Sequence, residues 1–284
     1  MENIGRTDLA AEAHRLWREQ AGTTTRLSGV RAEEEELEGL PVTAVEILDE
    51  EGERALGKPC GRYFELRLPA LVPQQGEAFE RAVLALAALI RRCLPEPLPS
   101  SALIAALGNP DVTPDALGPL CAASVLVTRH LQRVPGFEHL RPVALCRPGV
   151  LGTSGLESAF QVQTLCRALR PGCVLAVDAL AGAAPESLCR CVQICDAGIA
   201  PGSGVGNDRE ALSQGTLGVP VVSLGVPTVI DAALLNPGGE LGGLFVTPRY
   251  IDGAVRQYAR LLGYAINAAL QEGLLIADME LLLT

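Results

Sequence analysis

Three kinds of residue are scarce in this 284-residue chain: aromatic residues, lysine and histidine. Aromatic residues make up 4% of the sequence against 48% hydrophobic residues, so a buried core has to be built from aliphatic side chains. Lys58 is the only lysine, and the formal net charge is −10. Because a protein that binds phosphates needs a basic surface, this composition argues against a nucleic-acid-binding scaffold.

The sequence also lacks a long apolar run. The longest one, residues 82–90, is far shorter than the ~20 residues that a transmembrane helix needs, and the polar N-terminal residues lack the apolar core of a secretion signal. Nine cysteines are scattered along the chain, and the only cluster, Cys189, Cys191 and Cys195, has no second ligand pair for zinc. We therefore expect a cytoplasmic protein with no membrane contact and with packed, reduced, inert thiols.

Short apolar runs alternate with amphipathic segments along the chain, which favours an α/β fold. The acidic run 33–36 is expected to be a solvated face or a loop. The patterns predict strands at residues 42–47, 63–68, 102–107, 142–146, 173–177, 192–194 and 219–224, and helices within residues 1–24, 77–93, 116–132, 156–169, 229–235 and 248–272. We expect a mostly parallel, doubly wound sheet with helices on both faces and additional strands and a helix at the N-terminus.

Two aspartates each follow an apolar run that predicts a buried strand. Asp115 comes after the run 102–107 and a glycine-containing loop, and Asp178 directly follows the run 173–177. A carboxylate at the end of a core strand is costly to bury unless it is paired, hydrogen-bonded or used, and ligand sites of α/β proteins form at the carboxyl ends of strands. We therefore expect Asp115 and Asp178 to share a site for acid–base chemistry.

A series of motifs matches one known family in order along nearly the whole chain. The matching blocks lie at residues 6–10, 108–109, 113–119, 128–131, 141–143, 148–152, 155–157, 178–181, 201–207, 225–228 and 246–248. In these blocks the sequence resembles the germination proteases of spore-forming bacteria. Around residues 235–245 the chain is shorter than the family by several dozen residues, and residues 189–195 are unusually rich in cysteine.

The resemblance implies an endopeptidase that degrades small acid-soluble spore proteins during germination, in the cytoplasm of the forespore or spore core. It implies a zymogen that is trimmed at its N-terminus, assembles as a homotetramer and uses no cofactor. The family cleaves between an acidic residue and a bulky apolar residue that alanine follows, and Asp8-Leu9-Ala10 is such a sequence. We expect residues 1–8 to be a propeptide, residues 9–284 to be a single peptidase domain, and the enzyme to cleave itself between Asp8 and Leu9. The alternative is that Asp8 only caps the first helix.

The family's two functional aspartates match Asp115 and Asp178, and elementary chemistry agrees with that role. Like charges a few ångströms apart resist joint ionisation, so two close carboxylates share one proton. One of them can then take a proton from water while the other protonates the leaving amine. The alternative for Asp115, which follows Thr113 and Pro114, is a helix cap.

Further candidates in the matched blocks could support this pair. Asn109 and Arg129 could hydrogen-bond the carboxylates or the substrate, and the glycine-rich residues Gly202, Ser203 and Gly204 suit the close approach of an extended peptide. Because a cation should meet the acidic residue of the substrate, the candidates for that contact are Arg129, Arg141 and Arg147.

Three other polar residues have a structural and a functional interpretation. His130 is expected to be a structural hydrogen-bonding residue in the helix after Asp115. Glu157 either caps the helix that it precedes or binds substrate. Asp196 either orients the glycine-rich loop or is structural.

Two other interpretations are compatible with the sequence. Residues 108–118 also resemble a loop of hydrogenase-maturation peptidases, in which the residue matching Asp115 is a metal ligand. A divalent ion on Asp115, Asp178 and a histidine could polarise water or the scissile carbonyl, although no histidine has ligand spacing to another candidate. The other possibility is a catalytically silent α/β binding or assembly protein, against which the intact aspartates argue.

Overall fold

The computed structural model describes residues 7–21, 27–69, 74–206, 209–235, 241 and 243–283. The strands are β1 Val30–Leu37, β2 Leu40–Ile47, β3 Gly61–Arg67, β4 Ala102–Ala106, β5 Val143–Cys146, β6 Cys173–Gly182, β7 Cys191–Cys195, β8 Val221–Asp231 and β9 Phe245–Val246. The α-helices are α1 Ala10–Ala21, α2 Glu50–Leu56, α3 Glu77–Cys93, α4 Leu117–Cys121, α5 Leu151–Ser154, α6 Ser158–Leu169, α7 Gln214–Leu217, α8 Ala232–Leu235, α9 Ile251–Leu270 and α10 Ile276–Leu283.

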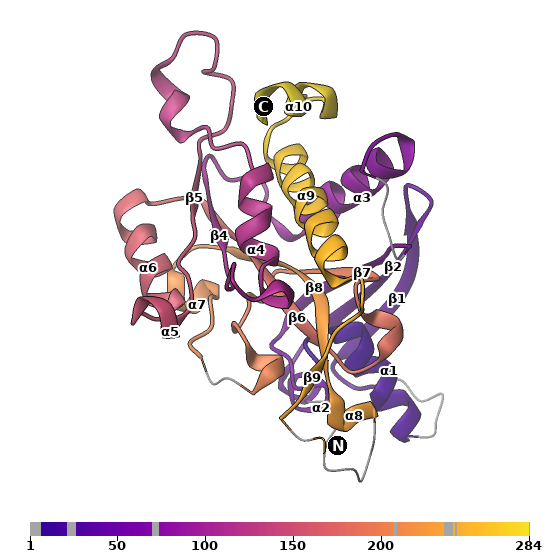
Figure 1. Ribbon diagram of the computed structural model, residues 1–284. Coiled ribbons are helices and arrows are strands. Elements are labelled where there is room, and N and C mark those ends of the chain that lie inside the picture. Colours follow the sequence, from indigo (N-terminus) through magenta and orange to yellow (C-terminus); the bar gives the residue numbers. More distant parts are fainter. Residues whose placement is uncertain are drawn as a thin grey trace.

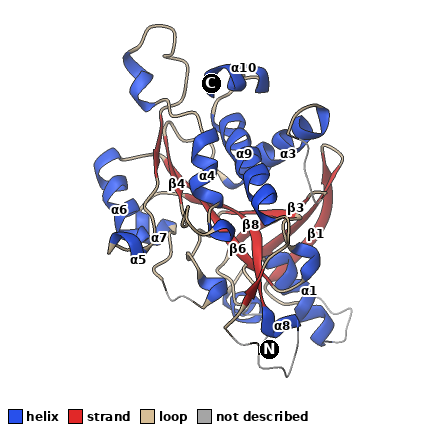
Figure 2. Cartoon of the chain, in the orientation of Figure 1, coloured by secondary structure: helices blue, strands red, loops and turns tan. Residues whose placement is uncertain are grey.

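One sheet with a parallel and an antiparallel part organises the described chain (Figure 2). Its strand order is β1-β2-β3-β7-β8-β6-β4-β5, and β9 pairs with the end of β8. The strands β5, β4, β6 and β8 run parallel to one another, whereas β7, β3, β2 and β1 continue the sheet with antiparallel pairing. The predicted α/β fold is confirmed, but the sheet is mixed and not mostly parallel, because β7 and the N-terminal strands pair antiparallel.

Helices cover both faces of the sheet, as predicted (Figure 1). On one face α3, α4 and α9 pack together over the large core cluster, and on the other face α6 and α7 cover a second cluster. Successive side chains of β6 point to opposite faces of the sheet and so pack in different clusters. Val174 and Ala176 lie in the cluster under α6 and α7, and Leu175 and Val177 lie in the large cluster. The helices α1 and α2 pack against the antiparallel end.

Two core strands are longer than the sequence pattern predicted. β6 continues to Gly182, so Asp178 lies inside a strand and does not follow one. β8 runs through Pro227 to Asp231, which replaces the predicted loop and the first three residues of the predicted helix, whose other four residues form α8. Proline can occur in a strand where the ladder is irregular, and the register between β6 and β8 shifts between Leu180 and Ala181, opposite this stretch.

The predicted helix over residues 116–132 is wrong in its length. The chain forms only the short α4 and then 3-10 turns, including Arg129–Arg133. Asn267 of α9 explains the break, because its amide donates to Ser124 O at 2.8 Å and accepts from Leu126 N at 2.8 Å. A buried side chain thus supplies the hydrogen bonds that a continuing helix would have supplied.

The acidic run 33–36 is part of β1, an exposed edge strand, so the predicted solvated face is confirmed and the predicted loop is not. Charged residues on an edge strand discourage pairing with other chains. Cys189, Cys191 and Cys195 are buried, and burial raises the pKa of the Cys195 thiol to about 11. Among the described residues, no helix has an apolar stretch long enough to cross a membrane.

Candidate functional site

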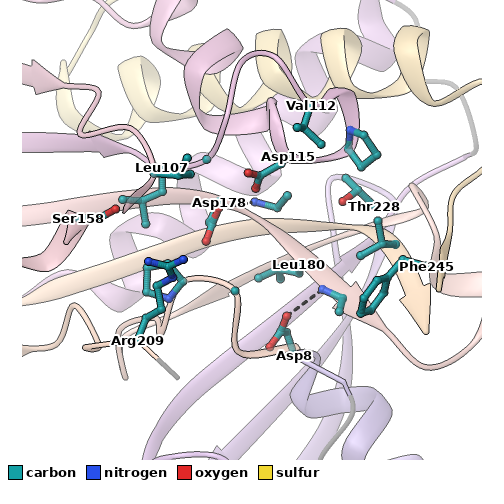
Figure 3. Close-up of a pocket in the computed structure, with 18 of the residues that line it drawn as sticks. Asp8, Leu107, Val112, Asp115, Ser158, Asp178, Leu180, Arg209, Thr228 and Phe245 are labelled. Atoms are coloured by element: carbon teal, nitrogen blue, oxygen red, sulfur yellow. Dashed lines mark hydrogen bonds between the residues drawn. The ribbon is translucent and has the colours of Figure 1, made fainter. Parts of the chain in front are cut away.

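A cavity of about 500 Å³ lies beyond the carboxyl end of β4, beside β6 and β8. Apolar side chains and three carboxylates face it (Figure 3). The residues that line it are Asp8, Leu107, Gly108, Val112, Pro114, Asp115, Val150, Leu151, Ser158, Asp178, Ala179, Leu180, Ala181, Pro201, Gly202, Arg209, Thr228, Val229, Phe245 and Thr247. The predicted meeting of Asp115 and Asp178 at this end of the parallel strands is therefore present in the structure.

Asp178 is the most deeply buried carboxylate of the cavity, with 4% of its surface exposed. Its Oδ1 accepts one hydrogen bond, from the N–H of its neighbour Ala179 at 2.9 Å, and the other described residues donate none. Burial, followed by the charge of Asp115 and a smaller contribution from Asp8, raises the pKa of Asp178 well above its ordinary value. Asp178 is therefore suited to hold a proton.

Asp115 lies on the turn that leaves β4 and is half-buried. Its Oδ2 accepts from the Asn109 N–H at 2.9 Å, and its carbonyl oxygen also accepts from that N–H at 3.0 Å. Gly108 makes the turn possible, because its φ is +110° and a Cβ there would lie 2.1 Å from the Asp115 carbonyl oxygen. Burial raises the pKa of Asp115, while the Asn109 hydrogen bond lowers it.

The third carboxylate of the cavity, Asp8, comes from the segment before α1 and is held by several hydrogen bonds. Its N–H donates to Ala181 O at 2.8 Å, and its side chain accepts from Ala181 N and from the Ser203 hydroxyl, both at 2.8 Å. Gln193 bridges the peptide after it, donating to Asp8 O at 3.0 Å and accepting from Ala10 N at 2.7 Å. The predicted cleavage sequence is thus fixed next to the two candidate catalytic aspartates.

Leu9 occupies an apolar pocket beside the cavity. Its side chain is fully buried and packs with Leu180, Cys191 and Ile199, while its N–H donates to the Thr7 hydroxyl at 3.0 Å. In the sequence Asp8-Leu9-Ala10, the acidic side chain therefore lines the cavity, and the side chains of Leu9 and Ala10 pack in two separate apolar clusters. Residues 1–6 of the predicted propeptide lie outside the described residues.

Thr228 and Arg209 are polar cavity residues that the sequence did not predict. The Thr228 hydroxyl is buried and has no hydrogen-bond partner among the described residues, so it can bind a water or a substrate group. Arg209 brings a positive charge to the cavity and lies 3.4 Å from a Glu157 carboxylate oxygen. Thr228 lies in one of the matched blocks, which is the signal that could have pointed to it, whereas nothing in the pattern marked Arg209.

The predicted supporting residues divide into two groups. Gly202 lines the cavity, Ser203 and Gly204 contact Asp8, and Asn109 acts on Asp115 through its backbone. Glu157 precedes α6 without capping it and pairs with Arg209.

The remaining supporting candidates lie away from the cavity. Arg129 and His130 are exposed on a segment that projects from the body of the molecule (Figure 1). Asp196 pairs with Arg62 at 2.7 Å.

The other predicted arginine contacts and the histidines also lie elsewhere. Arg141 donates to main-chain carbonyls, among them Leu270 O at 2.8 Å, and Arg147 is exposed. His14 lines a different hollow, and His139 is exposed. Within the described ranges no three histidine, cysteine, aspartate or glutamate side chains form a group that could hold a metal ion, so the predicted alternative of two aspartates and a histidine does not fit this arrangement.

Comparisons with known proteins agree with the sequence motifs. The family model for germination protease matches residues 8–237. A germination protease of Clostridium perfringens is 34% identical over 99% of both chains, and one of Caldanaerobacter subterraneus is 36% identical over 98% of both. One of Bacillus cytotoxicus is 42% identical over 81% of this chain and 64% of its own length. Among solved structures, a NiFe hydrogenase maturation protease of Thermococcus kodakarensis covers 63% of this chain at 19% identity and a TM-score of 0.36.

The family match extends over most of the chain and defines the class of protein as a peptidase. Within that class, the chain belongs to the germination protease family.

Proposed function

We propose that the chain is an endopeptidase of spore germination that hydrolyses peptide bonds with Asp115 and Asp178. The observation that carries the proposal is that both carboxylates line one cavity in a chain of a peptidase family. Its substrates are small acid-soluble spore proteins in the forespore or spore core, and the enzyme works as a homotetramer. These last points rest on the family membership.

The different surroundings of the two aspartates suggest which one holds the shared proton. Asp178, more buried and facing the charge of Asp115, is the acid, and Asp115 is the base. Asp115 takes a proton from water as the water oxygen adds to the scissile carbonyl carbon. Asp178 gives its proton to the amine nitrogen as the C–N bond breaks, and the proton gained by Asp115 then restores the pair.

The same chemistry applied to the chain itself removes its N-terminal segment. Asp8 lines the cavity together with Asp115 and Asp178, and the Asp8–Leu9 peptide is held by Gln193. Cleavage at this bond converts a zymogen into the processed enzyme. Asp8 has the acidic side chain that the substrate preference of the family requires.

A cleavage assay tests the proposal. The purified protein is incubated with a small acid-soluble spore protein at mildly acidic pH, with and without a chelator, and the products are identified by mass spectrometry. Cleavage after an acidic residue that the chelator does not affect is the expected result. Cleavage that the chelator abolishes would support the metal mechanism, and the absence of any cleavage would support a catalytically silent protein.

A further inference from the structure

The side chain of Asp8 lies in a binding place built by residues from two other segments. Ala181 N donates to its Oδ2 at 2.8 Å (Figure 3). The Ser203 hydroxyl donates to its Oδ1, also at 2.8 Å. Gly204 leaves the necessary room, because a Cβ at this position would lie 2.3 Å from Asp8 Oδ2 and 2.5 Å from the Ala181 Cβ. We call Ala181, Ser203 and Gly204 the carboxylate subsite.

A positive charge acts on this subsite. Lys58, the only lysine of the chain, is half-buried on the segment between α2 and β3. Burial lowers the pKa of its ammonium group, while the charges of Asp8 and Cys195 act to raise it. The charge of Lys58 thus interacts with the Asp8 carboxylate, and Lys58 is a candidate for the cation that the sequence had suggested among three arginines.

The main chain of Asp8 adds to an edge of the sheet. β4 pairs with β6 only as far as Val177, so the β4 side of β6 is open beyond that residue. The Asp8 N–H donates to Ala181 O on this open edge. Addition of an extended segment to a free strand edge is a common way to bind a peptide, in which main-chain hydrogen bonds supply affinity and side-chain pockets supply specificity.

We propose that the carboxylate subsite recognises the acidic residue of the substrate at the cleaved bond, and that Asp8 occupies it until the N-terminal segment is removed. This inference rests on the proposed function, which assigns catalysis to the same cavity. The ligand is an extended peptide that carries an aspartate or glutamate side chain. Occupation by Asp8 blocks this subsite in the uncleaved chain, so the segment is both a substrate and an inhibitor.

An acidic group in the subsite also acts on the catalytic pair. Burial and the charge of Asp115 are the main causes that raise the pKa of Asp178, and the charge of Asp8 adds to them. A substrate carboxylate in the place of Asp8 has the same effect. Recognition of the acidic residue thereby helps Asp178 to keep the proton that the leaving amine needs.

Peptide binding tests the inference without depending on cleavage. The full chain with Asp178→Asn is compared with the same chain carrying Asp8→Ala as well, and isothermal titration measures the affinity of acetyl-Asp-Leu-Ala-amide and of its Asn counterpart. We expect the double variant to bind the Asp peptide at least about tenfold more tightly than the Asn peptide, since hydrogen bonds to a charged group contribute about 1.5–3 kcal/mol. The Asp178→Asn chain, with its subsite filled, should bind the Asp peptide at least about tenfold more weakly than the double variant does.

Further substitutions in the double variant locate the binding. Ser203→Ala should reduce the Asp-over-Asn preference several-fold, Gly204→Ala should abolish it by filling the space, and Lys58→Gln should reduce it most at low salt. Ser28→Ala is the matched control, because the Ser28 hydroxyl also donates to an exposed carboxylate, that of Glu51, at 2.8 Å. This control should leave the preference unchanged.

Equal affinities of the two peptides for the double variant would overturn the inference and leave Asp8 as a structural tether of α1. So would a preference that Gly204→Ala leaves intact. If Asp8→Ala prevents folding, Asp8→Gly serves in its place, because it also empties the carboxylate subsite. If the double variant prefers the Asp peptide but the wild-type chain cleaves no substrate, the result would contradict the proposed function and leave the carboxylate subsite in place.

Discussion

Two regions of the molecule bury a carboxylate to nearly the same extent and treat it differently. Glu12 of α1 is 3% exposed and Asp178 of the cavity is 4% exposed. Glu12 accepts four hydrogen bonds, from the N–H groups of Ala183 and Ala184 and from the hydroxyls of Ser187 and Thr7, at 2.5–2.9 Å. Among the described residues, Asp178 accepts only one, from its neighbour Ala179.

The difference is the one expected between a structural carboxylate and the proposed catalytic one. Hydrogen bonds to the Glu12 carboxylate fix α1 to residues 183–187. Asp178 has one donor among the described residues, and its burial and the charge of Asp115 raise its pKa. Burial alone thus says little about function, whereas the number of donors around a buried carboxylate distinguishes the two roles.

The largest effect is expected from removing the carboxylates of the cavity. Asp115→Asn and Asp178→Asn should each lower kcat/KM for an acid-soluble spore protein by a factor of about 10³ or more, roughly 4 kcal/mol of transition-state stabilisation. Circular dichroism should show an unchanged fold. Either variant cleaving at close to the wild-type rate would refute the aspartate pair.

Removal of the Glu12 carboxylate should lower the stability of the fold more than the other substitutions do. Glu12→Ala leaves the donors from residues 183–187 unpaired, so the free energy of unfolding should fall by about 2–4 kcal/mol in urea titrations. Glu19→Ala, at an exposed position of the same helix, is the control and should stay within about 0.5 kcal/mol of wild type. If Glu12→Ala lowers the free energy of unfolding only slightly, Glu12 is not the structural carboxylate that the comparison with Asp178 requires.

The reactive carboxylate should have the opposite effect on stability. The pKa of Asp178 is higher in the folded chain than in the unfolded one, so the folded state binds more protons and loses stability as pH rises towards the folded pKa. Asp178→Asn should therefore raise the free energy of unfolding at neutral pH by on the order of 1 kcal/mol, and the gain should shrink as pH falls. Urea titrations across this pH range measure it, and a variant that is less stable than wild type at neutral pH would contradict the sign.

The smallest effect is expected at Asp196. Its ion pair with Arg62 is partly exposed and lies outside the cavity lining. Asp196→Asn should change stability by no more than about 1 kcal/mol and leave cleavage unchanged. A marked loss of activity would show that the loop after β7 takes part in the site.

The sequence predicted the elements whose pattern is local. The helix over residues 77–93 coincides with α3 because its apolar face repeats at helical spacing, and the alternation over residues 63–68 predicts β3. The break after α4 was beyond such reasoning, because it depends on Asn267, about 140 residues further along the chain. The extension of β8 depends in the same way on its pairing with β6.

The site was predictable to a similar degree. Asp115 and Asp178 follow from apolar runs and matched motifs, and strand topology brings both to one cavity. The placement of Arg209 at the cavity follows from loop geometry that no residue pattern encodes. Arg129 was suggested by its block and its charge, yet it lies on a projecting, exposed segment.

The most direct test of the central claim is the N-terminal mass of the purified protein after incubation at mildly acidic pH, for wild type and Asp115→Asn, with and without a chelator. The aspartate pair predicts a chain that begins at Leu9 in wild type only, with or without the chelator. An unprocessed wild-type chain, or processing that continues in Asp115→Asn, would contradict it.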